Sequence, residues 1–266
     1  MRQLSRQRSG VLPAGVSPAL NIAMPALALL ALLITATTAS GATAVTPQRL
    51  ELFDATIARR IPLALYPPAT GSCSGHCPVA IFGTGYQMTA SDYTFIGETL
   101  SAAGYLTLVI QYDLQEDAPM PYTGNIRSDR NPYWQRGANS LQFALSQLPA
   151  SFSDYAWAAP IIMGHSQGGD IAALFAAAHP DQISALVTLD NRRVPLPRNA
   201  SYPLLSLRSA DQPADPGVLP AEPDAACILK LPEISHNDMA DSGPAAAKAL
   251  ITSTILRFIK RHDCRL

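Results

Sequence analysis

The sequence Pro160-Ile161-Ile162-Met163 leads directly into Gly164-His165-Ser166-Gln167-Gly168-Gly169, and an alanine-rich apolar stretch begins at Asp170. This order predicts a buried strand, a tight turn that holds one serine, and a helix. In a G-x-S-x-G turn the serine hydroxyl projects beyond the end of the sheet, and glycines two positions away on either side let strand and helix pass closely. A glycine-rich connection without function is the alternative. Because a strand precedes the turn and a helix follows it, we interpret Ser166 as a catalytic nucleophile.

Residues 1–44 are expected to form a secretory signal peptide. Three arginines in the first eight residues precede an apolar stretch over residues 22–36, and small residues follow. The best cleavage motif is Ala42-Thr43-Ala44, so the mature chain would begin at Val45. An uncleaved membrane anchor is the alternative, but the apolar stretch contains a proline and is shorter than the roughly 20 residues needed to cross a bilayer. We therefore expect a secreted or periplasmic protein with no membrane span after cleavage.

The mature chain, residues 45–266, has the size of one catalytic domain. Its 266 − 44 = 222 residues suit a single α/β domain with a full core. The whole chain carries 20 acidic and 19 basic residues, and only 15% of its residues are charged. This balance argues against a nucleic-acid partner and favours a small or apolar one.

All four cysteines lie in the mature chain, which agrees with export to an oxidising compartment. Three pairings are possible. We prefer Cys73 with Cys77, which closes a small loop, and Cys227 with Cys264, which joins a late strand to the chain end. The segment from residue 73 to residue 77 also contains a histidine, but three ligands in five residues without distant partners are a weak zinc signal. No metal site is expected.

Short apolar runs alternate with amphipathic stretches along the mature chain. This pattern predicts an α/β fold with a mostly parallel central sheet and helices on both faces. The expected strands are residues 79–82, 105–111, 160–163, 185–189, 204–207 and 227–231. The expected helices cover residues 92–103, 132–148 and 244–262, besides the one after Ser166, and Asn131-Pro132 is interpreted as the start of the second.

A serine nucleophile requires a histidine base, and in this type of fold the histidine follows the serine in the chain. Of the five histidines, His76 and His165 precede Ser166 in the sequence. His179 ends the following helix, and His262 lies in the charged C-terminal tail. His236 remains, between the last expected strand and the last helix. We expect His236 to be the general base.

The acid that orients His236 has two main candidates. Asp190 ends the strand after the serine helix, and Asp211 follows the next strand. Asp215 is a weaker third candidate in the same loop. Either main candidate could hold the imidazole in its working tautomer.

Two backbone N–H groups are candidates for binding the oxyanion. Gln167 follows the nucleophile at the head of a helix, where the helix dipole favours negative charge. The loop Gly83-Thr84-Gly85-Tyr86 follows the first long strand, and its two glycines allow a close approach to substrate. We select the N–H groups of Gln167 and Tyr86.

Over residues 50–262 these motifs resemble the α/β-hydrolase superfamily, and within it the branch of platelet-activating-factor acetylhydrolases, chlorophyllases and secreted bacterial esterases. The segment from residue 78 to Tyr86 stands where that branch has an apolar strand ending in Ser-His-Gly-x, although this chain has Thr84 in place of the histidine. Leu189-Asp190 followed by Pro195-Leu196 is similar to the segment that carries the branch's catalytic aspartate. The resemblance therefore favours Asp190 over Asp211, and the segment beginning at His236 supports the histidine.

The combined motifs predict an exported serine hydrolase that cleaves carboxylic esters through an acyl-enzyme on Ser166, a mechanism that requires no cofactor. The expected partner is a small-molecule ester. A serine peptidase or amidase is an alternative, because the same groups cleave amides. A non-catalytic binding protein on the same fold is another, although such proteins usually lack the serine or the histidine, and both are present here.

Overall fold

A computed structural model describes residues 46–220 and 226–266. The predicted signal peptide lies outside the described residues. In the described part of the chain, no helix has the length and apolar character needed to cross a membrane.

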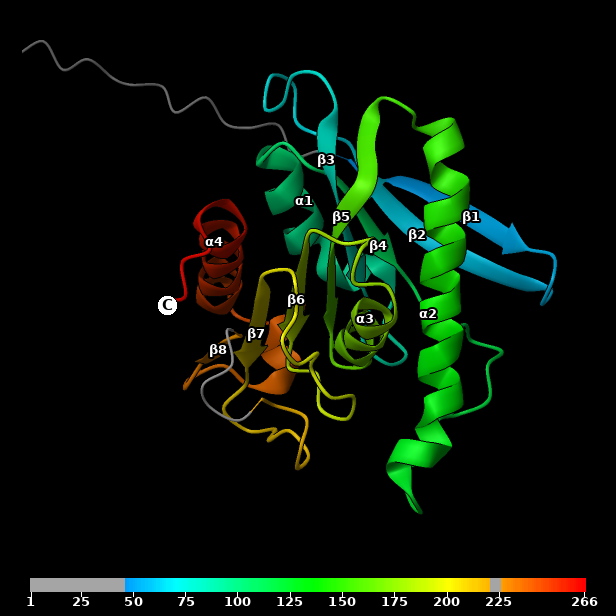
Figure 1. Cartoon of the computed structure of the whole chain (residues 1–266), viewed down its shortest axis with the longest axis vertical. Helices are drawn as coiled ribbons and strands as arrows, with labels where there is room; N and C mark the ends of the chain where they lie inside the picture. The colour runs from blue at the N-terminus through cyan, green and yellow to red at the C-terminus, as the bar shows by residue number, and fades with distance from the viewer. Residues whose placement is uncertain (1–45, 221–225) are drawn as a thin grey trace, which may run out of the picture. The chain divides into compact units, whose positions relative to one another are not determined.

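One eight-stranded sheet organises the described residues (Figure 1). Its strand order is β1-β2-β4-β3-β5-β6-β7-β8; β2 is antiparallel to β1 and β4, and the other pairs are parallel. The strands are β1 Gln48–Asp54, β2 Arg59–Tyr66, β3 Cys77–Gly83, β4 Leu106–Ile110, β5 Tyr155–His165, β6 Ala185–Leu189, β7 Leu204–Arg208 and β8 Cys227–Lys230. Because the parallel strands share one direction, the loops after β3, β5 and β6 meet at the same edge of the sheet.

Helices cover both faces of this sheet, as the alternation of strands and helices predicted (Figure 1). They are α1 Thr94–Ala102, α2 Ile126–Ser151, α3 Gln167–Ala178 and α4 Ala245–Arg261, with short 3-10 helices η1 Ala90–Tyr93 and η2 His236–Met239. One buried hydrophobic cluster lies between the sheet and α2 and α3, and a second lies between the sheet and α1 and α4. The continuous apolar runs of the central strands are thus buried on both sides.

Helix α2 begins earlier than the sequence predicted. Its first residue is Ile126, and the side chain of Asn125 accepts the backbone N–H of Ser128 at 3.3 Å. The expected start at Asn131-Pro132 is therefore wrong, and Pro132 lies inside the helix. Proline removes one backbone hydrogen bond there, and burial of the helix's apolar face against the sheet, with Trp134 at 2% exposure, offsets that loss.

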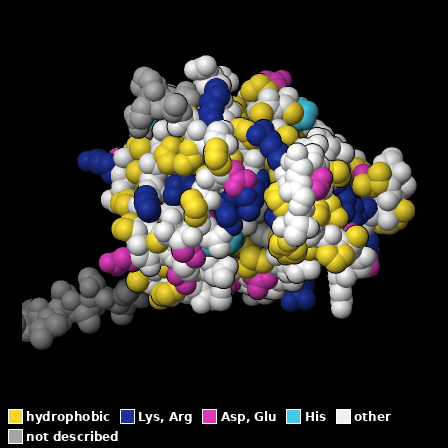
Figure 2. Space-filling view, turned by 90° about the horizontal axis from the view of Figure 1, so that it is seen from below, with side chains coloured by type: hydrophobic (Ala, Val, Ile, Leu, Met, Phe, Trp, Pro, Cys, Tyr) yellow, Lys and Arg dark blue, Asp and Glu magenta, His cyan; other side chains and the backbone are white. Residues whose placement is uncertain are grey.

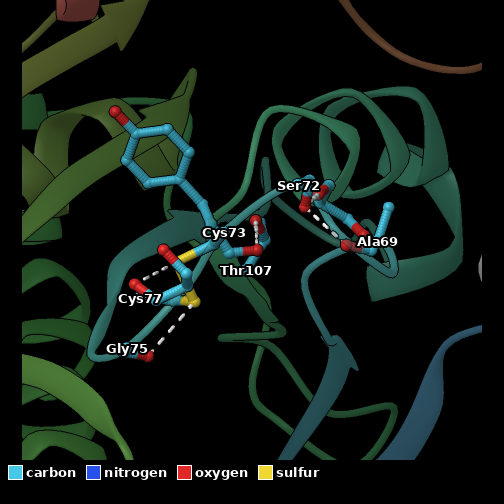
Figure 3. Close-up of a disulfide and its surroundings, with 9 residues drawn as sticks. Ala69, Ser72, Cys73, Gly75, Cys77 and Thr107 are labelled. Carbon is cyan, nitrogen blue, oxygen red and sulfur yellow. Dashed lines mark hydrogen bonds between the residues drawn. A yellow bond between two sulfur atoms is a disulfide. The ribbon is translucent and has the colours of Figure 1, made fainter.

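Disulfides join Cys73 to Cys77 and Cys227 to Cys264. The first closes the loop that leads into β3. Just before this loop, the Ser72 hydroxyl donates to the carbonyl of Ala69 at 2.6 Å, and Figure 3 shows both residues near the disulfide. The second joins β8 to the segment after α4. Both anchor chain segments at the ends of secondary-structure elements.

Candidate active site

Ser166 lies in the turn between β5 and α3, in a strained backbone conformation. Its φ of 53° and ψ of −117° are unfavourable for a residue with a side chain. The turn forms because glycines leave space on both sides: a Cβ at Gly164 would lie 2.3 Å from the carbonyl carbon of Gly168, and a Cβ at Gly168 would lie 2.2 Å from the carbonyl oxygen of Gly83. The turn therefore places Ser166 at the end of the sheet, against the loop that follows β3.

Three side chains from distant parts of the sequence form a hydrogen-bonded chain. His236 Nε2 lies 3.0 Å from Ser166 Oγ, and His236 Nδ1 lies 2.6 Å from Asp190 Oδ2. Ser166 follows β5, Asp190 follows β6, and His236 begins η2 after β8. In this arrangement the imidazole can take the serine proton while the carboxylate holds the ring in place.

The carboxylate of Asp190 is fully buried and has several partners. Its Oδ1 accepts the backbone N–H of Ser209 at 2.9 Å, and its Oδ2 accepts the Ser209 hydroxyl at 2.7 Å. Arg208 Nη2 forms an ion pair with Oδ1 at 3.2 Å, without the alignment of a hydrogen bond. Burial raises the pKa of Asp190, but the hydrogen bond from His236, the charge of Arg208 and the bonds from Ser209 outweigh it, so the pKa is lowered. The carboxylate is therefore ionised at neutral pH.

The two other candidate acids lie elsewhere. Asp211 accepts the backbone N–H of His236 at 2.7 Å and makes no hydrogen bond to its ring. Asp215 forms an ion pair with Arg193. Of the three candidates, Asp190 is the one that contacts the imidazole nitrogen.

Tyr86 and Gln167 line the same cavity as Ser166. Gln167 is the first residue of α3, so its N–H has no partner within the helix. On either side of Tyr86, the N–H of Gly85 donates to Tyr93 Oη at 3.0 Å and that of Gln87 donates to Asp113 Oδ2 at 3.1 Å. Within residues 46–220 and 226–266, the N–H groups of Tyr86 and Gln167 have no protein acceptor. Both donors are thus free for an oxyanion.

Comparison with known proteins agrees with this architecture. The family model described as alpha/beta hydrolase fold matches residues 155–217, which include Ser166 and Asp190. The ferulic acid esterase from Streptomyces cinnamoneus superposes with a TM-score of 0.61 at 17% identity, covering 85% of this chain and 92% of that one. The chain has the α/β-hydrolase fold.

Two further solved structures share the α/β-hydrolase fold with this chain. Est1E from Butyrivibrio proteoclasticus has a TM-score of 0.56 at 14% identity, covering 80% of this chain and 97% of that one. Alpha/beta hydrolase domain-containing protein 10 from mouse has a TM-score of 0.57 at 13% identity, covering 81% and 100%. No curated protein matches by sequence.

Asp113 is a site residue of this α/β-hydrolase fold that sequence reasoning missed. Besides the N–H of Gln87, it accepts the side-chain amide of Gln167 at 3.3 Å, and it lies 3.4 Å from Arg136. It therefore joins the loop after β3 to the head of α3, the two segments that present the free N–H groups. An acidic residue just after a buried parallel strand, here β4, is the sequence signal that could have identified it.

His165 and Tyr93 were missed as well. His165 Nδ1 lies 2.7 Å from Tyr93 Oη, and the two histidine rings of His165 and His236 lie 4.7 Å apart between centroids. Burial, together with the nearby His236, lowers the pKa of His165 to about 3, so His165 is neutral. Because Tyr93 also accepts the Gly85 N–H, this pair contacts both the loop after β3 and the ring of His236.

No group of three His, Cys, Asp or Glu side chains in the described ranges is arranged to hold a metal ion. The chemical groups gathered at the site are a hydroxyl, an imidazole, a carboxylate and two free N–H donors. Together they suit acyl transfer through a serine nucleophile.

Proposed function

We propose that this protein is a serine hydrolase that cleaves small carboxylic esters through an acyl-enzyme on Ser166. The observation that carries the proposal is the hydrogen-bonded chain from Ser166 Oγ to His236 Nε2 and from His236 Nδ1 to Asp190 Oδ2. The fold shared with a protein named as a ferulic acid esterase favours ester substrates.

In the first half of the reaction, Ser166 Oγ attacks the ester carbonyl carbon while His236 Nε2 takes the hydroxyl proton. The carbonyl oxygen becomes an oxyanion, which the N–H groups of Gln167 and Tyr86 stabilise. The tetrahedral intermediate then collapses, His236 gives its proton to the alkoxide leaving group, and the alcohol departs. Water repeats the sequence on the acyl-enzyme and releases the acid. These steps require no cofactor.

The resemblance of the sequence to platelet-activating-factor acetylhydrolases, chlorophyllases and secreted bacterial esterases supports the same assignment. In that branch the acid follows the strand after the nucleophile helix, which is the position of Asp190 after β6. We also propose that the protein is exported, with residues 1–44 removed as a signal peptide. The two disulfides support export, because disulfides persist in oxidising compartments.

The test compares purified mature protein with its Ser166→Ala variant on p-nitrophenyl esters and on the matching anilides. We expect turnover of the esters by the wild type and its loss in the variant, with the fold retained. Ser153→Ala is the matched control, because Ser153 is exposed and lies outside the site. A fluorophosphonate probe should label the wild type and the control but not Ser166→Ala. Undiminished turnover by Ser166→Ala would refute the nucleophile, and faster cleavage of anilides than of esters would favour a peptidase or amidase.

A further inference from the structure

A cavity of about 160 Å³ opens beside the proposed nucleophile. Ser166, Gln167 and Tyr86 lie in its wall, so a group inside it lies beside the proposed nucleophile and the residues that carry both proposed oxyanion donors. At this size the cavity accommodates only a few non-hydrogen atoms, since a water molecule in the liquid occupies about 30 Å³. The cavity therefore suits a short arm of a substrate.

Three arginines line this cavity: Arg130 from the start of α2, and Arg192 and Arg193 from the loop after β6. Figure 2 shows Lys and Arg side chains gathered around a hollow near the middle of one face, with a histidine side chain at its edge. Like charges that line one cavity repel each other, and the repulsion is stronger where water is partly excluded. Burial lowers the pKa of Arg130, and the neighbouring charge of Arg193 lowers it further.

Few protein carboxylates neutralise these charges. Arg193 forms an ion pair with Asp215. Arg130 instead donates Nε–H to the carbonyl of Pro121 at 2.7 Å and packs over the Tyr122 ring. Among the described residues no carboxylate lies within ion-pair distance of Arg130 or of Arg192, whose partners are the backbone carbonyl of residue 213 and a glutamine side chain. The cavity wall therefore keeps guanidinium N–H donors that no protein anion uses.

Asp170 is the acidic residue in the cavity wall, and one of its two carboxylate oxygens is bound by backbone N–H groups. It is 3% exposed, and its Oδ1 accepts the backbone N–H groups of Arg192, Arg193 and Val194 at 3.1, 2.9 and 2.9 Å. These bonds hold the loop after β6 in place. The two arginine side chains are thus presented from a fixed backbone, which reduces the entropy cost of binding an anion there.

We infer that the site takes a short ester that carries a carboxylate, with the carboxylate in the cavity between the three arginines. The planar guanidinium donates two parallel hydrogen bonds to a carboxylate, and such charge-assisted bonds are strong in a partly buried site. This inference rests on the proposed function, because it names the substrate class of the same site.

The test compares monoethyl succinate with ethyl butanoate, which has a methyl group where the succinate ester has its carboxylate. We expect the wild type to favour the succinate ester in kcat/KM by about 10- to 100-fold, the range expected for one or two hydrogen bonds to charged groups. The preference should shrink at about 1 M salt, where the screening length falls to about 3 Å.

The variants Arg130→Gln and Arg193→Gln should lower the ratio of the two kcat/KM values toward one. Arg127→Gln is the matched control: Arg127 lies on the same helix as Arg130, is exposed, and does not line the cavity. A wild type that hydrolyses ethyl butanoate at least as well as monoethyl succinate would overturn the inference and leave the proposed esterase activity intact.

Binding to the Ser166→Ala variant, measured by ligand-observed NMR, separates recognition from turnover. We expect monoethyl succinate to bind more tightly than ethyl butanoate, and we expect Arg130→Gln, added to Ser166→Ala, to weaken the binding of monoethyl succinate. Equal binding of the two esters would overturn the inference whatever the turnover data. If the proposed serine hydrolase function itself were wrong, the fluorophosphonate probe would not label Ser166 in the wild type, and this result is distinct from equal binding of the two esters.

Discussion

The most informative single substitution is Asp190→Asn, paired with Asp211→Asn as its control. Both aspartates accept a hydrogen bond from His236, but Asp190 binds the ring at Nδ1 and Asp211 binds the backbone N–H. The two substitutions therefore remove a similar charge near the same residue and differ in whether the ring is affected.

The geometry around Asp190 determines how an asparagine would sit. Oδ1 accepts the N–H of Ser209 at 2.9 Å and faces the cationic Arg208 at 3.2 Å, so the amide oxygen would take this position. The amide NH₂ would then replace Oδ2, 2.6 Å from His236 Nδ1. A donor at that place forces the imidazole proton onto Nε2, the nitrogen that must accept the Ser166 proton. In a well-studied serine protease the corresponding change lowers kcat about 10⁴-fold, and we expect a loss of about 10³- to 10⁴-fold here.

Asp211→Asn keeps an oxygen that can accept the His236 N–H, so its effect on kcat should be no more than a few-fold. The assay is steady-state ester hydrolysis, with circular dichroism to show that each variant is folded, because Asp190→Asn also leaves the buried Arg208 without its anionic partner. A folded Asp190→Asn enzyme with near-normal kcat, together with a large loss in Asp211→Asn, would show that our choice of the acid is wrong.

Three further substitutions test the anchoring of the loop after β6, the turn that holds Ser166, and the disulfide between Cys227 and Cys264. Burial raises the pKa of Asp170 from 3.8 to about 6, so the folded state holds the proton more tightly and stability falls as pH rises from about 4 to 6. Asp170→Asn should lack this fall, which is on the order of 3 kcal/mol in the free energy of unfolding. Urea unfolding at pH 4 and pH 7 measures it, and an equal change in stability between the two pH values in wild type and variant would contradict the prediction. Gly168→Ala places a Cβ 2.2 Å from the Gly83 carbonyl oxygen, which should displace the oxyanion loop and lower kcat by about 100-fold or more, and normal kcat would disprove the role of that contact. Replacing Cys227 and Cys264 by serine opens a loop of sequence separation 37 and should cost about 4 kcal/mol of stability in the chain-entropy model, measured by urea unfolding of the double variant against wild type, with equal midpoints as the refuting result.

Local patterns predicted the central strands and the turn after β5, because strands buried on both faces read as continuous apolar runs. The hairpin of β1 and β2 was missed for the same reason. It lies at the edge of the sheet, and β1 alternates apolar and polar residues while β2 contains Pro62. An alternating strand lacks an unbroken apolar run, and a proline within an apolar run argues against a strand.

The start of α2 was misplaced because Asn131-Pro132 is a strong local signal for the beginning of a helix. Asn125 offers a weaker signal, but it is where the structure begins the helix. Packing against the sheet decided the outcome, since burial of a whole helix face outweighs the one hydrogen bond that proline removes.

The sequence by itself determined the order of the parallel strands and the main helices, the serine turn, and the candidates His236, Asp190 and Asp211, because these follow from periodicity and from residue types next to each other in the chain. The family resemblance favoured Asp190 over Asp211, and only the tertiary structure shows which of the two contacts the ring of His236. Both follow parallel strands and both contact His236, so the choice depends on whether the ring or the backbone is within reach.

The arginine-lined cavity was likewise beyond sequence reasoning. Arg130 stands about sixty residues before Arg192 and Arg193, and no local pattern connects them. The fold brings them together because α2 packs against α3, and because Asp170 of α3 binds the backbone of the loop that carries the other two. Two kinds of contact between distant segments create the charged wall beside Ser166: apolar packing of α2 against α3, and hydrogen bonds from the loop to the buried Asp170. Such contacts exist only once the chain is folded.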